Sequence, residues 1–313
     1  MTFTPGFSTT VQLRPRYEGC NICTWIGFKH VNYLVEEAVL GLFRTATMAP
    51  GRLYEEYGLG LDITRISTRI LKALHVDDEV TAEVRVLTIE RGAQLAVTLS
   101  VGKTKAVSAK VSVVLLRDTR VGGEVAPIPE EIRGLVVDTY RVAELRSLPM
   151  SDLAVGIGRN AVTRQVDRQF RTGSGHAIAW RWRVPYFYCH YVTRLQMSGL
   201  LRNMEEVVDL FLLEQGASIR TMLDTADLIP VVPNSEIELW DEVGMEEEIL
   251  TVFEVESVFK NSVYTARMDT YALREGNAVH VSTGRIMHGY AHIDSRRDWS
   301  MIEFDDRLRA AVG

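Results

Sequence analysis

The chain has 313 residues, a formal net charge of −6 and a pI near 5.7, a length typical of about two domains. Hydrophobic residues make up 46% and charged residues 24%, ordinary values for a globular protein. The acidic balance argues against a nucleic-acid partner or binding to a membrane surface. The sequence has no apolar run long enough for a membrane helix and no signal-peptide core, so a cytoplasmic location is expected.

In chain order, the first half predicts one strand, one long helix and then four strands. Residues 9–22 are strand-like. Apolar residues then recur at the i, i+3, i+4, i+7 spacing of a helix face, namely at Val31, Leu34, Val35, Ala38, Val39, Leu42 and Phe43. Runs rich in Val, Ile, Leu and Thr predict strands at 59–66, 79–90, 94–101 and 106–116, and Arg91-Gly92 marks a hairpin turn.

The segment 118–176 predicts a linker with helical segments. Pro127-Ile128-Pro129-Glu130-Glu131 is typical of a helix start, and Gly173-Ser174-Gly175 of a flexible stop. A connection this long suits two units that pack side by side with the linker crossing the surface.

The second half repeats the order of the first. A strand-like segment at 178–191 precedes a helix with an apolar face formed by Leu200, Met204, Val207, Val208, Phe211 and Leu212. Strands are predicted at 231–239, 248–259, 262–273 and 278–290, with a turn at Lys260-Asn261. Residues 300–313 are expected to be a polar tail.

The two halves align with each other at a constant offset of 169 residues. Without a gap, residues 17–21 fall on 186–190 and residues 34–39 fall on 203–208, so that Glu36-Glu37 falls on Glu205-Glu206. The chain therefore predicts two copies of one α+β unit, at 1–117 and 177–299. In each unit an antiparallel sheet would be wrapped around a central long helix, which is the element order of the hotdog fold.

The shared glutamates are candidates for chemistry. Residues seven apart lie on the same edge of a helix, as do His30 and Glu37 in one copy and Gly199 and Glu206 in the other. The free amides at a helix N-terminus suit the stabilisation of an oxyanion. A carboxylate near them could act as a general base on water or attack a carbonyl directly through a mixed anhydride. Alternatively, adjacent glutamates lie on a solvated helix face.

Two segments resemble parts of known families. Residues 196–206 resemble the helix start of hotdog acyl-CoA thioesterases, in which a Gly is followed seven residues later by an acid, as in Gly199 and Glu206. Ser198 matches the hydroxyl residue of the fluoroacetyl-CoA type, although no histidine near Ile237 matches that type. His30-Val31-Asn32-Tyr33-Leu34 resembles the 4-hydroxybenzoyl-CoA branch, but Cys23 stands where that branch has its Asp.

The resemblance implies a double hotdog, an intramolecular pseudo-dimer with active sites between the copies. It implies thioesterase activity on an acyl-CoA or acyl-carrier-protein substrate, with no metal or organic cofactor, and it leaves a homodimer open. Glu37 would face Ser198 and Gly199, while Glu206 would face Lys29 and His30. Of these two sites, the one with Glu37, Ser198 and Gly199 is preferred because its small residues leave room for a thioester.

Other candidates are weaker, and each has a structural alternative. His190 could be a base or a core histidine, and Asn32 could orient a carbonyl or cap its helix. Arg91 and Lys260 could meet the phosphates of a pantetheine-bearing carrier or lie free in solvent. The pair Cys20 and Cys23 suggests a redox or zinc site but is better explained as inert thiols. A hotdog dehydratase acting on 3-hydroxyacyl or enoyl thioesters, and a non-catalytic acyl-thioester-binding protein, remain alternative functions.

Overall fold

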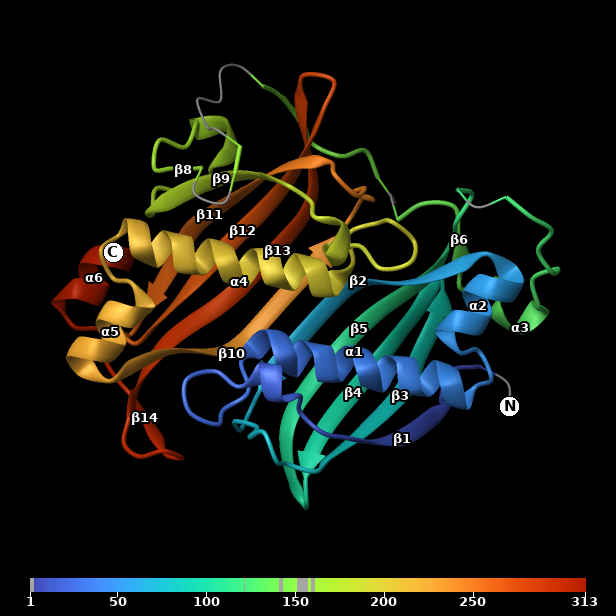
Figure 1. The fold of residues 1–313 in the computed structure, drawn as a ribbon, viewed down its shortest axis with the longest axis horizontal. Coiled ribbons are helices and arrows are strands. Elements are labelled where there is room, and N and C mark those ends of the chain that lie inside the picture. The colour runs from blue at the N-terminus through green and yellow to red at the C-terminus, as the bar shows by residue number, and fades with distance from the viewer. Residues whose placement is uncertain (1–2, 121, 141–142, 151–156, 159–160) are drawn as a thin grey trace.

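A computed structural model describes residues 3–120, 122–140, 143–150, 157–158 and 161–313. Over these residues, 14 strands form one sheet, which two long helices cover on the same face (Figure 1). The helices are α1 (Phe28–Thr45) and α4 (Met197–Glu214), each of 18 residues. Their broad apolar faces explain this placement, because each helix buries that face against the sheet.

The first half supplies one end of the sheet and the second half supplies the other. The elements of the first half are β1 (Ser8–Leu13), η1 (Tyr17–Gly19), α1, α2 (Pro50–Tyr57), β2 (Leu59–Ile70), β3 (Val80–Glu90), β4 (Gly92–Val101) and β5 (Thr104–Arg117). Those of the second half are β9 (Ala177–Arg183), η3 (Tyr186–Tyr188), α4, α5 (Ile219–Ala226), β10 (Leu228–Leu239), β11 (Glu248–Phe259), β12 (Val263–Arg274), β13 (Asn277–Ile293), β14 (Trp299–Met301) and α6 (Asp306–Val312).

The first strand of each half is shorter than the sequence predicts. β1 ends at Leu13 and β9 ends at Arg183, and each is followed by a short 3-10 turn, η1 or η3. Pro15 and Pro185 lie in these gaps. Proline has no backbone N–H to donate to a strand ladder and fixes its own φ, so the chain leaves the sheet there. The turns then bring the chain back to the start of α1 or α4.

The two predicted sheets are joined into one. Their strands lie in the order β1-β3-β4-β5-β2-β10-β13-β12-β11-β9-β8, with β8 at Val162–Thr163. The junction is the antiparallel pairing of β2 with β10, in which Ile66 lies opposite Ile237. Without this pairing each half would expose an unpaired strand edge, whose N–H and C=O groups would seek partners elsewhere. The junction therefore fixes one half against the other through the backbone.

The two halves are related by an approximate two-fold axis. The offset of 169 residues carries the pair Arg65–Glu238 onto the pair Asn234–Arg69, and both occur in the junction register. The same offset carries Tyr33 onto Arg202, and Arg202 Nε donates to the Tyr33 hydroxyl at 3.0 Å. Equivalent positions can touch only close to the axis, so the axis passes between α1 and α4.

The linker runs along the sheet, where β6 (Val136–Val137) pairs with β5, β7 (Ser147–Pro149) with β13 and β8 with β9. Its described elements are α3 (Glu130–Arg133), β6, β7, β8 and η2 (Arg168–Phe170). Part of the predicted linker, residues 121, 141–142, 151–156 and 159–160, lies outside the described residues. Phe170 packs against Tyr271 and Ala278, which gives the linker a small core of its own.

Glu254 on β11 anchors the end of the linker. Its buried carboxylate accepts hydrogen bonds from the backbone N–H groups of Thr172 and Gly173, from the Thr172 hydroxyl and from Arg171. Burial raises the pKa of Glu254, but these hydrogen bonds outweigh it and hold the pKa below its usual value. A carboxyl with a lowered pKa stabilises the fold above its unfolded pKa, and this stabilisation is lost as the pH falls through the folded value.

Glu254→Gln should therefore lower the free energy of unfolding by about 1–3 kcal/mol at neutral pH. Since the ionised form carries the effect, the difference from wild type should shrink below pH 4.5, the usual pKa of the group. Urea unfolding at a series of pH values measures both changes. A difference between the two proteins that does not depend on pH would contradict this assignment.

The C-terminal residues are not the polar tail that the sequence predicts. Trp299–Met301 pairs with β13 as β14, and α6 buries Leu308, Ala311 and Val312. Asp305 caps α6 by accepting from the Leu308 N–H at 2.8 Å. These apolar positions are too few and too close to the chain end for a periodicity to stand out. None of the described helices is long and apolar enough to cross a membrane.

Candidate active site

A small cavity lies between the first half of the chain and the start of α4. Its volume is about 100 Å³. The residues that line it are Glu36, Leu40, Pro50, Leu61, Ile63, His190, Tyr191, Gln196 and Met197. Polar groups from both halves therefore meet at one cavity with an apolar wall. His190 and Tyr191 are only partly buried and form its rim.

Glu36 projects from the edge of α1 that faces α4. Its pKa is raised to about 7, first by burial and then by the neighbouring charge of Glu37, while Arg202 acts in the opposite direction. A carboxyl with this pKa gains or loses its proton near neutral pH, which is the range where general base catalysis is most effective. Leu40 follows one turn later and continues the cavity wall.

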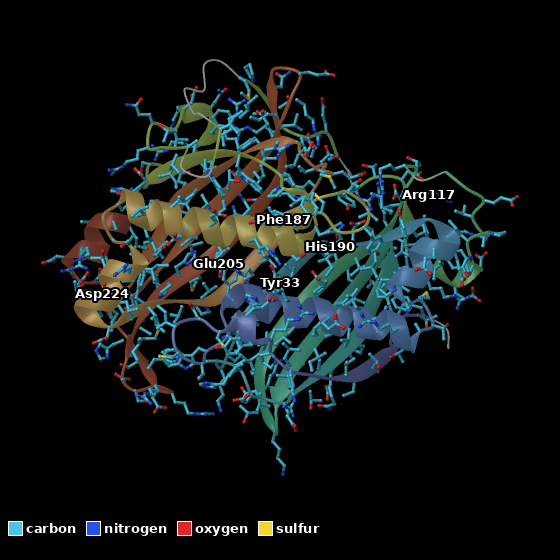
Figure 2. All side chains as sticks on the ribbon, viewed as in Figure 1. Tyr33, Arg117, Phe187, His190, Glu205 and Asp224 are labelled. Atoms are coloured by element: carbon cyan, nitrogen blue, oxygen red, sulfur yellow. The ribbon has the colours of Figure 1, made fainter. Side chains whose placement is uncertain are left out.

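Two polar side chains pair beside the cavity. Ser198 Oγ lies 2.9 Å from His190 Nε2, within hydrogen-bond distance. Ser198 is 8% exposed and stands in the first turn of α4, and its carbonyl oxygen accepts from the Tyr33 hydroxyl at 2.9 Å. Burial lowers the pKa of His190, so its ring is neutral at neutral pH. Figure 2 shows His190 near the N-terminal end of α4, and Tyr33 and Glu205 between the two long helices.

The N-terminus of α4 presents backbone amides next to this pair. The first helical bond at this end runs from Leu200 N–H to the Gln196 carbonyl, so the amides of Met197, Ser198 and Gly199 precede the helical ladder. No side chain caps them. Such amides, together with the helix dipole, suit a partial negative charge.

A buried ion pair holds this helix start in place. Asp62 on β2 accepts from Arg194 at 2.6 Å and from the Gln196 side chain at 3.0 Å. The two charged side chains are 2% and 9% exposed. Since Asp62 belongs to the first half and Arg194 to the second, this pair connects the halves directly beneath the cavity.

The equivalent position on the other side of the axis is closed. The offset of 169 residues carries Lys29 onto Ser198 and Glu36 onto Glu205. Lys29 Nζ and Glu205 Oε2 form an ion pair between α1 and α4, and the Lys29 side chain is only 18% exposed. One side has a serine paired with His190 beside the cavity that Glu36 lines, whereas the other side has an ammonium group joined to the carboxylate.

Gly199 and His30 occupy equivalent positions, and their neighbours differ in the opposite sense. A Cβ on Gly199 would lie 2.5 Å from the Tyr188 carbonyl oxygen, while a Cβ on Gly19 would lie 2.9 Å from His30 Cβ. Tyr188 and Gly19 are themselves related by the offset of 169 residues. In the first half the large residue is His30 on α1, and it packs against Gly19 in the turn η1. In the second half the large residue is Tyr188 in the turn η3, and it packs against Gly199 on α4. Packing therefore accounts for both Gly199 and His30. Burial lowers the pKa of His30 to about 4.

The structure does not bring Glu37 and Ser198 together. Glu37 accepts from Arg44 at 2.5 Å, has a side chain that is 46% exposed, and does not line the cavity. Glu206 is half-buried on the corresponding edge of α4 and also lies away from the cavity. The helix edges that face each other lie one residue before the predicted ones. They carry Lys29 and Glu36 on α1, and Ser198 and Glu205 on α4.

The remaining candidates lie elsewhere. Asn32 is buried, donates to the Phe28 carbonyl and accepts from Thr68, so its amide ties α1 to β2. Arg91 donates to the Thr139 carbonyl in the linker, and Lys260 lies over the Phe259 ring at a hairpin turn. The cysteines carry free thiols, and the part of the chain that the structure describes holds no cluster of three metal-ligating side chains.

No protein-family profile and no curated protein sequence matches the chain, but solved structures do. A candidate oleoyl thioesterase from Lactobacillus plantarum aligns with a TM-score of 0.61 and 13% identity, over 91% of this chain and 95% of its own. An acyl-ACP thioesterase from Bacteroides thetaiotaomicron aligns with a TM-score of 0.54 and 11% identity, over 90% and 97%. The 12:0-ACP thioesterase from Umbellularia californica gives 0.54 and 11%, over 90% and 93%.

At these identities the likeness concerns the fold. The chain has the hotdog fold that its element order predicts, and the match extends over nearly the whole length of each of these proteins.

Proposed function

We propose that the chain is a double hotdog protein that hydrolyses an acyl thioester in the cavity beside Glu36. The two units would be 1–117 and 177–299, joined by the linker 118–176, with α6 packed as part of the second unit. The approximate two-fold axis between α1 and α4 supports this organisation. The fold shared with proteins described as thioesterases supports the reaction class.

The observation that carries the proposal is the position of Glu36 opposite the start of α4. A thioester carbonyl placed in the cavity would direct its oxygen to the amides of the first turn, which would stabilise the developing oxyanion. The ionised Glu36 would take a proton from the attacking water. Over the whole reaction the C–S bond would break, with release of the thiol and of the carboxylic acid. This chemistry needs no metal and no organic cofactor.

The cavity wall indicates where the acyl group would lie. Leu40, Pro50, Leu61, Ile63 and Met197 form the apolar part of the cavity wall. Transfer of an alkyl chain from water to such a surface is favourable by about 0.8 kcal/mol per buried methylene. The polar rim at His190 and Tyr191 would face the pantetheine arm of CoA or of a carrier protein.

A panel of acyl-CoA and acyl-carrier-protein thioesters, assayed for release of free thiol, tests the activity. Release of thiol and free acid in equal amounts is expected with at least one acyl group. The panel should include 3-hydroxyacyl and enoyl thioesters, because gain or loss of water without thiol release would identify a hydratase instead. No thiol release above the blank from any substrate would overturn the proposal.

A further inference from the structure

The hydroxyl of Ser198 is paired with a base at the edge of the cavity, and this arrangement has a consequence for the reaction. Ser198 Oγ and His190 Nε2 are 2.9 Å apart, and His190 lines the cavity. A nucleophile and its base commonly stand at such a distance. Ser198 also lies within the first turn of an 18-residue helix, where backbone amides stabilise negative charge.

We propose that Ser198 is the nucleophile that receives the acyl group and that His190 is its base. Ser198 Oγ attacks the carbonyl carbon as its proton passes to His190 Nε2. The tetrahedral intermediate collapses, the C–S bond breaks, and the leaving thiolate takes the proton from the imidazolium. The product of this half-reaction is a serine ester on α4 and a free thiol.

The inference rests on the proposed thioester hydrolysis and divides it between two groups. Glu36 lines the same cavity from α1 and activates the water that attacks the ester. The ester C–O bond then breaks, the Ser198 oxygen recovers a proton by way of His190, and the acid leaves. Ser198 and His190 therefore serve the first step, and Glu36 serves the second.

The state of His190 agrees with this division. A base must be neutral before it accepts a proton, and burial lowers the pKa of His190, with Arg202 adding to the effect and Asp62 opposing it. The Ser198 hydroxyl lies within hydrogen-bond distance of one nitrogen of this ring, Nε2.

Only one side of the two-fold axis has this pair among the described residues. The positions equivalent to His190 and Ser198 are Asn21 and Lys29. Lys29 is joined to Glu205 in an ion pair, and an amide such as Asn21 is not a base at neutral pH. The paired hydroxyl and imidazole therefore lie on the side of the axis that has the cavity, and the Lys29–Glu205 ion pair lies on the other side.

Trapping the acyl group in Glu36→Gln tests the inference. With the second step blocked, this variant should release about one thiol per chain in a burst and retain the acyl mass, with the ester mapping to Ser198 by peptide mass spectrometry.

Ser198→Cys keeps a nucleophile in place and should carry an acyl thioester that hydroxylamine removes. Ser198→Ala should carry no adduct and should lose at least about 10³-fold in kcat. His292→Asn, at an exposed histidine paired with Asp294, is the control and should match wild type.

Two results would overturn it. One is turnover by Ser198→Ala within about twofold of wild type, which places the serine outside the reaction. The other is an acyl adduct on Glu36 in place of Ser198 in the wild-type protein. In both cases thiol release would continue and would still depend on Glu36, so hydrolysis itself would stand. Failure of hydrolysis would instead appear as no thiol release by wild type.

Discussion

Glu36→Gln is expected to lower kcat for thioester hydrolysis about 10³-fold, the effect of removing a general base. The amide has nearly the same shape as the carboxyl, so the cavity that Glu36 lines keeps its form. It cannot take a proton from water, however. Steady-state thiol release measures kcat, and urea unfolding of the variant checks that the fold is retained.

Two neighbouring glutamates provide matched controls. Glu37→Gln removes an exposed ion pair with Arg44 and one of the causes that raise the pKa of Glu36, and Glu205→Gln removes the ion pair with Lys29 on the other side of the axis. Each should change kcat above pH 8 by less than about threefold, because neither side chain lines the cavity and neither can act on the water there. Loss of activity in Glu37→Gln equal to that in Glu36→Gln would contradict the choice between the two residues.

Asp62→Ala is expected to lower the free energy of unfolding by about 3–5 kcal/mol, because the buried Arg194 then keeps only the more distant carboxylate of Glu242, at 3.8 Å. The Asp62–Arg194 pair is 2% and 9% exposed and joins the two halves of the chain. Gln196 also loses its acceptor. Urea unfolding at neutral pH measures the change.

Asp224→Ala is the matched control for this prediction. It removes an ion pair with Arg220 of the same type, but on the exposed surface of α5. Exposed pairs typically contribute less than about 1 kcal/mol. A change of similar size in both variants would show that burial of the Asp62 pair is not what makes it important.

Local sequence patterns were sufficient to predict most of the helices and strands. The apolar spacing around Val35 and Met204 falls within α1 and α4, and the predicted turns at Arg91 and Lys260 are hairpin turns in the structure. The incorrect predictions were the ends of the first strands and the separation of the two sheets. The strand ends depend on single residues, and the joining of the sheets depends on contacts between the halves. Pro15 and Pro185 end their strands early, and nothing in β2 or β10 alone indicates that the two would pair.

The site could be predicted only in part, because a helix register is needed to within one residue. Glu36 and Glu37 both flank the buried face of α1, and a single helix does not reveal which flank meets α4. A signal was present in the residues Lys29, Tyr33, Glu36 and Leu40, which recur at helical spacing on one edge. Their partners on α4, Ser198 and Arg202, occupy the same edge of the second copy.

The difference between the two sides of the axis follows from a few substitutions. Ser198 pairs with His190 beside the cavity, while Lys29, at the equivalent position, pairs with Glu205. Duplication within one chain permits this, because each side can change independently, whereas two identical chains would change both sides together. One catalytic cavity in each chain is the expected result.

The pH dependence of kcat for wild type is the most direct test of the role of Glu36. If the ionised carboxyl is the base, kcat should rise about tenfold per pH unit below an apparent pKa near 7 and level off above it, since the pKa of Glu36 is about 7. The rising limb should be absent from the residual activity of Glu36→Gln. A wild-type profile that is flat between pH 5.5 and 8.5, or that falls through pH 7, would contradict the account.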